Sequence, residues 1–461
     1  MSALGHPGGG AGGQTGSVTL DEAAAFEPRL RRERLPVRRA EHGLVDFGET
    51  VVGDVEIAVV RSAPGPVTVR YGEDLAETAR TAEYTGGWFL DPVDRFEVGP
   101  GRSIVRSTGR RCFRFLRIDG ADEAEVEVTT VGYPVNEPAT FRCDDPLLER
   151  VWDICVRTTR LCMQRWYEDG PKRDGLLWIG DYRVQFLCNW FVFGDRDLAR
   201  KSLALVALHA FPDGGLPATP VRGGVRQPDR LPYMRGVHDA SGDGYLGTWN
   251  LLDYDADFVM ATAEYLRLTR DLAFARALWP VVRRTAERLA PIDVVPNVPG
   301  ERCRFITDNQ PHKDGWWGSV PVLVAGLSLA LRTAADLATT FGDDPTPFLV
   351  AARERDREGA AFRSATRGLH TDPEDGRPSD ALVAAASAAG WLDDHAAEFD
   401  RVLHAPDART PLSGHRQFHF LDALWRAGRP EAALRHVRRT WGHMLANGAT
   451  TLMFEGVPNY P

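Results

Sequence analysis

The sequence predicts a multidomain β + α fold: an N-terminal antiparallel β-sandwich followed by an (α/α)6 toroid, which is a closed ring of helix hairpins. Three observations lead to this prediction. The chain has 461 residues, too many for one small core. Its apolar residues recur with a period of two at first and with a helical period afterwards. Short and long connections then alternate along the helical part. We therefore expect a flexible tail at 1–35, a sandwich at 36–140 and a helical domain at 141–461.

The sandwich is predicted by short segments in which apolar and polar side chains alternate. The clearest are VTVRYGED (67–74), CFRFLRID (112–119) and AEVEVTTVGY (124–133). Clusters of Gly, Pro and Asp punctuate this region, as between antiparallel strands that have one buried face. The glycine-rich stretch from Gly8 to Gly16 is typical of a flexible tail.

The helical part is expected to begin at Asp145. This residue is suited to cap a helix, and Pro146 is suited to the first helical position. Four later connections each join an apolar helix end to a new helix start through a tight polar turn, at 191–200, 266–275, 340–349 and 424–433. Longer irregular segments lie at 211–248, 291–318 and 366–378. In a ring of about eleven or twelve antiparallel helices, this alternation places the long loops together at one end.

The composition argues against several classes of protein. The formal net charge of −9 disfavours a nucleic-acid partner, which needs a basic surface. No apolar run reaches the roughly 18 residues of a membrane span. The six cysteines show neither a CxxC pair nor a histidine at zinc-finger spacing, so we expect no metal site and no cofactor. Because the N-terminus lacks the features of a secretory signal, we expect reduced thiols and a cytoplasmic location. The oligomeric state stays open.

A charged, irregular stretch follows the first expected helix. EDGPKRDGLLWIGD, residues 168–181, combines four carboxylates, a Lys-Arg pair and a tryptophan without a helical or strand period. The long loops add RGVHDASGDGYLGTW and FITDNQPHKDGWWGS, which are also rich in Asp, His, Trp and Gly. Aromatic faces stack on sugar rings, and carboxylates accept hydrogen bonds from hydroxyls and transfer protons. We therefore expect a carbohydrate or glycoside as the substrate.

Glycoside hydrolysis needs two carboxyl groups on opposite sides of the scissile bond. The charged stretch offers Glu168, Asp169, Asp174 and Asp181. The far end of the chain offers Glu455 in GATTLMFEGVPNY, where apolar neighbours would raise its pKa. Glu168 is interpreted as incidental to the site.

DGPKRDGLLWIGD resembles the Asp-x-Pro-x-Arg-Asp/Glu…Trp-x-Gly-Asp signature of the bacterial α-L-rhamnosidases, glycoside hydrolase family 78. Other segments resemble that family in the same order: the strand-rich region at 44–75, the helix FRCDDPLLERVWDICVRTT, RFITDNQ, and WGHMLANGATTLMFE. The resemblance implies a β-sandwich before a six-hairpin glycosidase toroid, and a hydrolase that inverts the anomeric centre and releases terminal α-L-rhamnose.

Carried over residue by residue, the resemblance implies that Asp169, Arg173, Trp178 and Asp181 bind the sugar ring. It implies Glu455 as the general base, and Asp174 takes the place of the general acid. Many members have glutamate as the acid, whereas here Asp174 is followed by glycine. Members usually continue beyond the segment that matches here, so a C-terminal truncation of the helical domain stays open.

The long loops contribute further candidates for sugar binding by residue type alone: Asp239, Asp308, Trp316 and Trp317. Two alternatives to an α-L-rhamnosidase remain open at this point. One is a related glycosidase that acts on another sugar. The other is a catalytically impaired homologue that only binds carbohydrate.

Overall fold

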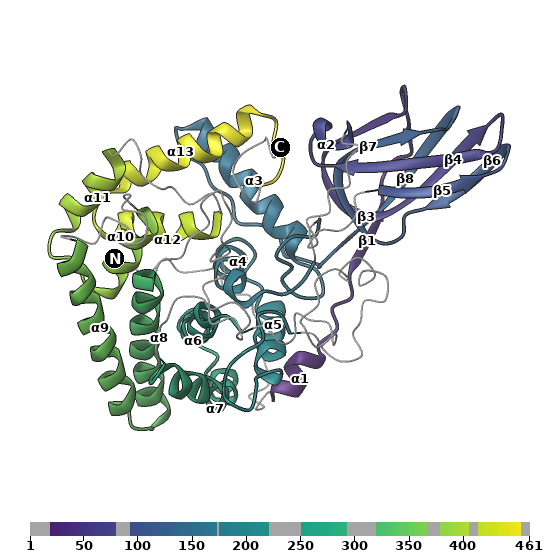
Figure 1. Ribbon diagram of the computed structural model, residues 1–461. Helices are drawn as coiled ribbons and strands as arrows, with labels where there is room; N and C mark the ends of the chain where they lie inside the picture. The colour runs from purple at the N-terminus through teal and green to yellow at the C-terminus, as the bar shows by residue number, and fades with distance from the viewer. Residues whose placement is uncertain are drawn as a thin grey trace.

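The computed structural model describes residues 19–79, 93–172, 175–220, 250–292, 320–366, 379–404 and 414–452. It confirms the predicted fold class, because an antiparallel sheet domain is followed by a ring of helices (Figure 1).

The sheet domain contains eight described strands, all paired antiparallel with their neighbours. They are β1 (Arg31–Arg34), β2 (Arg38–Arg39), β3 (Leu44–Arg61), β4 (Gly65–Gly72), β5 (Val93–Val98), β6 (Gly101–Arg106), β7 (Arg111–Asp119) and β8 (Glu123–Gly132). A short helix, α2 (Leu75–Ala79), follows β4.

The long strand β3 joins two layers of this sheet. Its first part pairs with β7, which continues to β4 and β5. Its second part, from Gly53, lies between β8 and β6. The register shifts between Asp46 and Val51, which lets the strand bend. Alternate residues of both layers, such as Val69 and Val126, meet in one apolar core, so the predicted sandwich is confirmed.

A short helix lies inside the segment 1–35 that was expected to be a flexible tail. Helix α1 (Leu20–Ala25) is capped by Thr19, whose hydroxyl accepts the N–H of Glu22 at 3.2 Å. Its Ala23 and Ala24 are buried in the core of the helical domain. The sequence did not indicate this helix, because six residues span too few turns for a helical period of apolar residues to be recognised.

Eleven helices of the described residues make up the helical domain. They are α3 (Pro146–Cys162), α4 (Ile179–Val192), α5 (Asp197–Leu208), α6 (Leu252–Thr269), α7 (Leu272–Leu289), α8 (Val320–Phe341), α9 (Thr346–Thr366), α10 (Asp380–Ala389), α11 (His395–His404), α12 (Gly414–Arg426) and α13 (Pro430–Ala446). Asp145 caps α3 as predicted, because its carboxylate accepts the N–H of Leu147 at 3.0 Å and Pro146 follows it.

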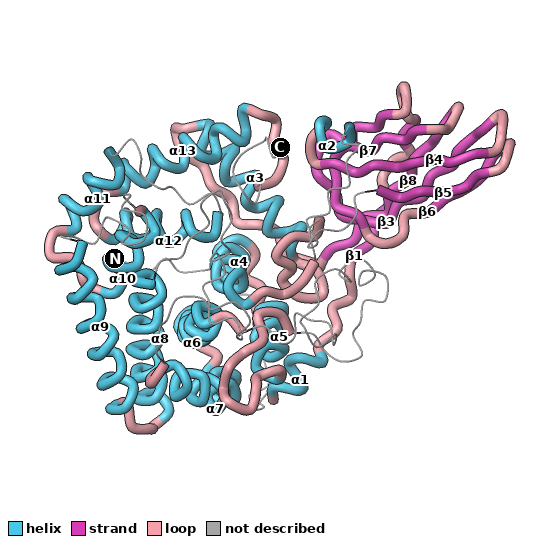
Figure 2. The backbone as a smooth tube through the Cα atoms, in the orientation of Figure 1, coloured by secondary structure: helices cyan, strands magenta, loops and turns pink. Residues whose placement is uncertain are grey.

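The four predicted short turns are present. They join α4 to α5, α6 to α7, α8 to α9 and α12 to α13. A fifth short turn, which was not predicted, joins α10 to α11, and the other connections between the helices are longer. Figure 2 shows the helices as a ring, with α9, α11 and α13 on its outer rim. The even-numbered helices from α4 to α12 line a central cavity.

The first and last described helices of the ring meet. Val151 and Ile154 of α3 pack against Trp441, Met444 and Leu445 of α13. Asp145, which caps α3, also joins the two helices, because its carboxylate accepts a hydrogen bond from Arg438 of α13 at 2.6 Å. The outer helices therefore form a closed wall on this side.

Helix α8 has the length and apolar composition of a membrane span. In the structure it is a core helix, because Leu327, Leu331 and Ala334 are fully buried among the other helices of the ring. Its apolar character is explained by neighbours on several sides.

Candidate active site

The signature stretch forms a compact loop between α3 and α4. The N–H of Asp169 donates to the carbonyl of Leu176 at 2.9 Å, and the N–H of Gly175 donates to the carbonyl of Gly170 at 3.0 Å. The indole N–H of Trp166 donates to the carbonyl of Gly175 at 3.1 Å. Gly175 has φ +64°, a left-handed conformation that glycine adopts most readily. The glycine after Asp174 is therefore explained by the turn.

Two predicted sugar-binding residues meet at the beginning of α4. Trp178 precedes its first residue, and its ring lies edge-on to Tyr254 with centroids 6.2 Å apart. The hydroxyl of Tyr254 donates to Asp181 Oδ2 at 3.5 Å. Asp181 lies in the first turn of α4, where the helix dipole favours a carboxylate. Trp178 is only 7% exposed, so most of its ring packs in the core. Sugar binding by Asp169, Trp178 and Asp181 stays a prediction.

Glu168 has a structural role that the sequence did not reveal. It is 1% exposed, and both its carboxylate oxygens lie 2.6 Å from Nη2 of Arg110, which directly precedes β7. Its carbonyl accepts the side-chain amide of Gln185 at 2.6 Å. Glu168 therefore joins the signature loop to the sheet domain and is not incidental.

The other predicted site residues lie outside the described residues. They are the catalytic candidates Asp174 and Glu455 and the binding candidates Arg173, Asp239, Asp308, Trp316 and Trp317. Next to Asp174 the described residues are Lys172 and Gly175, and before Glu455 the last described residue is Leu452.

Gly180 lets α4 approach α6, the helix that carries Tyr254. A Cβ at this position would lie 1.9 Å from Cε1 of Tyr254, well inside van der Waals contact. We expect Gly180→Ala to lower the free energy of unfolding by about 1–3 kcal/mol, as overpacking of a core does. Gly326→Ala in α8 is the matched control, because its Cβ would meet nothing within 4 Å. Urea denaturation of both variants checks this, and equal stabilities would contradict it.

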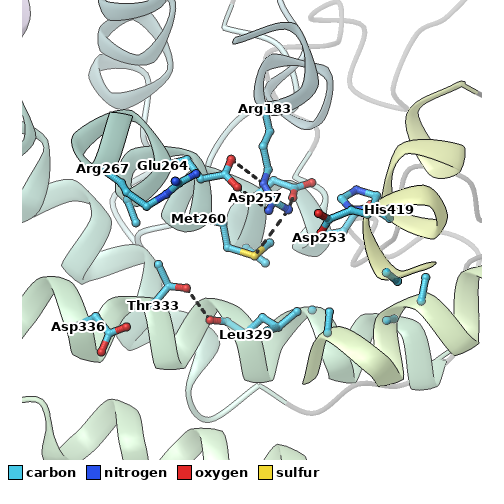
Figure 3. Close-up of a pocket in the computed structure, with 18 of the residues that line it drawn as sticks. Arg183, Asp253, Asp257, Met260, Glu264, Arg267, Leu329, Thr333, Asp336 and His419 are labelled. Carbon is cyan, nitrogen blue, oxygen red and sulfur yellow. Dashed lines mark hydrogen bonds and ion pairs between the residues drawn. The ribbon is translucent and has the colours of Figure 1, made fainter. Parts of the chain in front are cut away.

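A cavity of about 750 Å³ occupies the centre of the ring beside α4 (Figure 3). Its polar wall includes Asp253 and Asp257, which lie in the first and second turns of α6. Arg183 of α4 binds Glu264 through two hydrogen bonds, at 2.9 and 2.7 Å, and lies 4.0 Å from Asp257. The sequence had a signal for these acids, since LLDYDADF places two carboxylates four residues apart in an apolar helix.

The carboxyl of Asp257 holds its proton more tightly than an ordinary aspartate. Burial raises its pKa well above the usual value, although Arg183 lowers it. The carboxylates of Asp253, Glu264 and Asp181 raise the pKa further. In the folded protein this group therefore stays protonated to a higher pH than in the unfolded chain. Its favourable contribution to stability is complete below about pH 4 and declines as the pH rises toward the folded pKa.

Asp257→Asn should remove this decline, because an amide does not ionise. We expect the free energy of unfolding of the variant, minus that of the wild type, to increase from pH 5 to pH 8, by at most about 1.4 kcal/mol per pH unit. Denaturation at both pH values measures this difference. Asp144→Asn, at an exposed position before α3, is the control for the same chemical change outside the ring. A flat difference for Asp257→Asn would contradict the assigned proton.

Residues 136–229 match the family model described as the bacterial alpha-L-rhamnosidase 6 hairpin glycosidase domain. This segment is therefore similar to that domain family. It contains α3, the signature loop and α4, so the resemblance stated from the sequence is confirmed. No curated protein sequence matches the chain. The match to the glycosidase domain model supports a glycoside hydrolase.

Solved rhamnosidase structures share the fold along nearly the whole chain. The rhamnosidase from Klebsiella oxytoca, with rhamnose bound, is 24% identical with a TM-score of 0.72, and the match covers 95% of this chain and 92% of that one. The rhamnosidase of Bacillus sp. GL1 is 24% identical with a TM-score of 0.69, over 89% of this chain and 42% of that one. The Streptomyces avermitilis alpha-L-rhamnosidase, complexed with L-rhamnose, is 19% identical with a TM-score of 0.66, over 94% and 41%. These likenesses confirm the sheet domain and the six-hairpin ring.

Proposed function

We propose that this protein is an inverting α-L-rhamnosidase that releases terminal α-L-rhamnose, or a similar deoxy sugar, from a glycoside. The observation that carries the proposal is the signature loop at the start of α4, inside the segment that matches the rhamnosidase domain family. The cavity beside α4, with its carboxylate wall, supports a site that recognises hydroxyl groups.

The chemistry assigned to the site needs one proton donor and one proton acceptor. Asp174, as the acid, would give its proton to the glycosidic oxygen while the bond from that oxygen to the anomeric carbon breaks. Glu455, as the base, would take a proton from a water molecule that attacks the anomeric carbon from the opposite face. The products are the sugar with an inverted anomeric centre and the free alcohol.

The remaining signature residues are assigned to the sugar. Asp169 and Asp181 would accept hydrogen bonds from ring hydroxyls, and Arg173 would orient a carboxylate or a hydroxyl. Trp178, Trp316 and Trp317 would offer ring faces, and Asp239 and Asp308 further acceptors.

A panel of p-nitrophenyl glycosides tests the function. We expect release of p-nitrophenol from the α-L-rhamnoside at pH 5–7, faster than from the other sugars of the panel. Faster turnover of another glycoside would favour a related glycosidase instead. Binding of rhamnose in calorimetry without turnover of any glycoside would favour a protein that only binds carbohydrate.

A further inference from the structure

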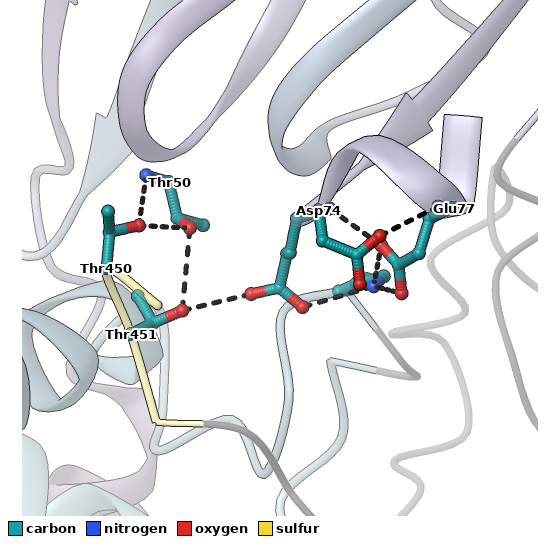
Figure 4. Close-up of polar contacts among 7 residues, drawn as sticks. Thr50, Asp74, Glu77, Thr450 and Thr451 are labelled. Carbon is teal, nitrogen blue, oxygen red and sulfur yellow. Dashed lines mark hydrogen bonds and ion pairs between the residues drawn. The ribbon is translucent and has the colours of Figure 1, made fainter. Parts of the chain in front are cut away.

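One carboxylate of the sheet domain contacts two distant segments of the helical domain. Glu73 lies in the turn between β4 and α2. Its Oε2 accepts a hydrogen bond from Nζ of Lys172 at 3.1 Å, and its Oε1 accepts one from the hydroxyl of Thr451 at 3.1 Å. Figure 4 shows the chain of contacts that runs from Thr450 and Thr451 to the turn that begins α2.

The contact to Lys172 is a half-buried ion pair with two carboxylates. The ammonium also lies 2.5 and 2.6 Å from the two oxygens of Glu77. Burial lowers the pKa of Lys172, but the carboxylates of Glu73 and Glu77 outweigh burial and raise the pKa above its ordinary value. The lysine therefore stays charged. Its side chain is 31% exposed, so this pair is better shielded from solvent than an ordinary surface pair.

The turn that carries Glu73 is itself fixed. The N–H of Glu73 donates to Glu77 Oε2 at 2.7 Å, and the N–H of Glu77 donates to Asp74 Oδ1 at 2.8 Å. Both bonds lie within five residues, so they fix the backbone from which the Glu73 side chain extends.

The contact to Thr451 is part of a second anchored segment. Thr50 of β3 donates its N–H to the hydroxyl of Thr450 at 3.0 Å and lies 3.4 Å from the hydroxyl of Thr451. The N–H of Leu452 donates to the hydroxyl of Thr158 in α3 at 2.8 Å. Thr451 is only 6% exposed, so the segment is held between the sheet domain and α3.

We propose that Glu73 is a positioning residue that sets the distance between the two catalytic segments. This inference rests on the proposed function. Lys172 precedes the acid candidate Asp174 by two residues, and Thr451 precedes the base candidate Glu455 by four. An inverting glycosidase needs its two carboxyl groups roughly 6.5–9.5 Å apart, with room for water between them. A shared anchor at Glu73 ties both segments to one point of the sheet domain.

The first test is kinetic. Glu73→Ala removes both contacts, and we expect it to lower kcat by about 10- to 100-fold on an aryl α-L-rhamnoside with little change in KM, because small displacements of catalytic groups have effects of this size. Glu73→Gln should restore most of kcat, since its amide can accept from Lys172 and donate to Thr451. Glu56→Ala, which removes an exposed pair with Arg106, is the control and should behave like the wild type. Unchanged kcat in Glu73→Ala, or no recovery in Glu73→Gln, would overturn the proposal.

The second test does not depend on activity. Amide hydrogen exchange is followed in the peptides that cover 166–176 and 448–452. Glu73→Ala should speed exchange in both peptides, Lys172→Met only in the first, and Thr451→Val only in the second. Faster exchange in one peptide or in neither for Glu73→Ala would overturn the shared anchor. If the wild type hydrolyses no glycoside, the proposed function fails, and the exchange pattern still decides whether the anchor exists.

Discussion

Asp174→Asn and Glu455→Gln are each expected to lower kcat by about 10²- to 10⁴-fold, because each removes one partner of general acid–base catalysis. The two losses should differ in their dependence on the leaving group. An acidic phenol such as 2,4-dinitrophenol departs without protonation, so it should recover much of the activity of Asp174→Asn. It should recover little of the activity of Glu455→Gln, because activation of water is still needed.

Steady-state kinetics with p-nitrophenyl and 2,4-dinitrophenyl rhamnosides measure both effects. Asp144→Asn and Glu56→Gln make the same chemical changes at exposed positions and should leave kcat unchanged. If either catalytic variant keeps a kcat close to that of the wild type, that residue loses its assigned role. Equal recovery of both variants by the better leaving group would contradict the division into acid and base.

Glu168→Gln is expected to lower the free energy of unfolding by about 3–5 kcal/mol, because it leaves Arg110 charged and unpaired in a buried place. The side chains of Arg110 and Glu168 are only 13% and 2% exposed. Glu125→Gln is the matched control, because its pair with Arg102 is exposed and should contribute less than about 1 kcal/mol.

Urea denaturation of the variants checks this expectation. The double variant Arg110→Met with Glu168→Leu should be more stable than Glu168→Gln, because no buried charge is then left without a partner. A loss for Glu168→Gln no larger than that of Glu125→Gln would contradict a structural role for the pair.

The sequence predicted those features that repeat along the chain. Alternation over 124–133 predicted β8, and the polar turns predicted where helices end. Asp145 and Pro146 predicted the start of α3 because a helix cap is a local arrangement of side chain and backbone. Each of these depends on residues that are close together in the sequence.

Features that depend on distant residues were not predictable in this way. Nothing near Glu168 in the sequence indicates Arg110, which lies 58 residues away and in another domain. The acids of α6 follow a helical period, yet only the ring shows that Asp253 and Asp257 face a cavity. The same holds for Glu73, whose two partners are 99 and 378 residues distant.

The candidate site was predicted by its residue types and by its resemblance to a known signature. The structure brings Trp178 and Asp181 together at Tyr254, a residue that the sequence did not single out. It also gives the reason for Gly175, which sequence alone presents only as a departure from the family.

Proton NMR of the first sugar released from an α-L-rhamnoside tests the central claim most directly. The account predicts that β-L-rhamnose appears first and that the α anomer grows in later by mutarotation, because water attacks from the face opposite the leaving group. Initial appearance of α-L-rhamnose, or no release of rhamnose from any α-L-rhamnoside, would contradict an inverting α-L-rhamnosidase.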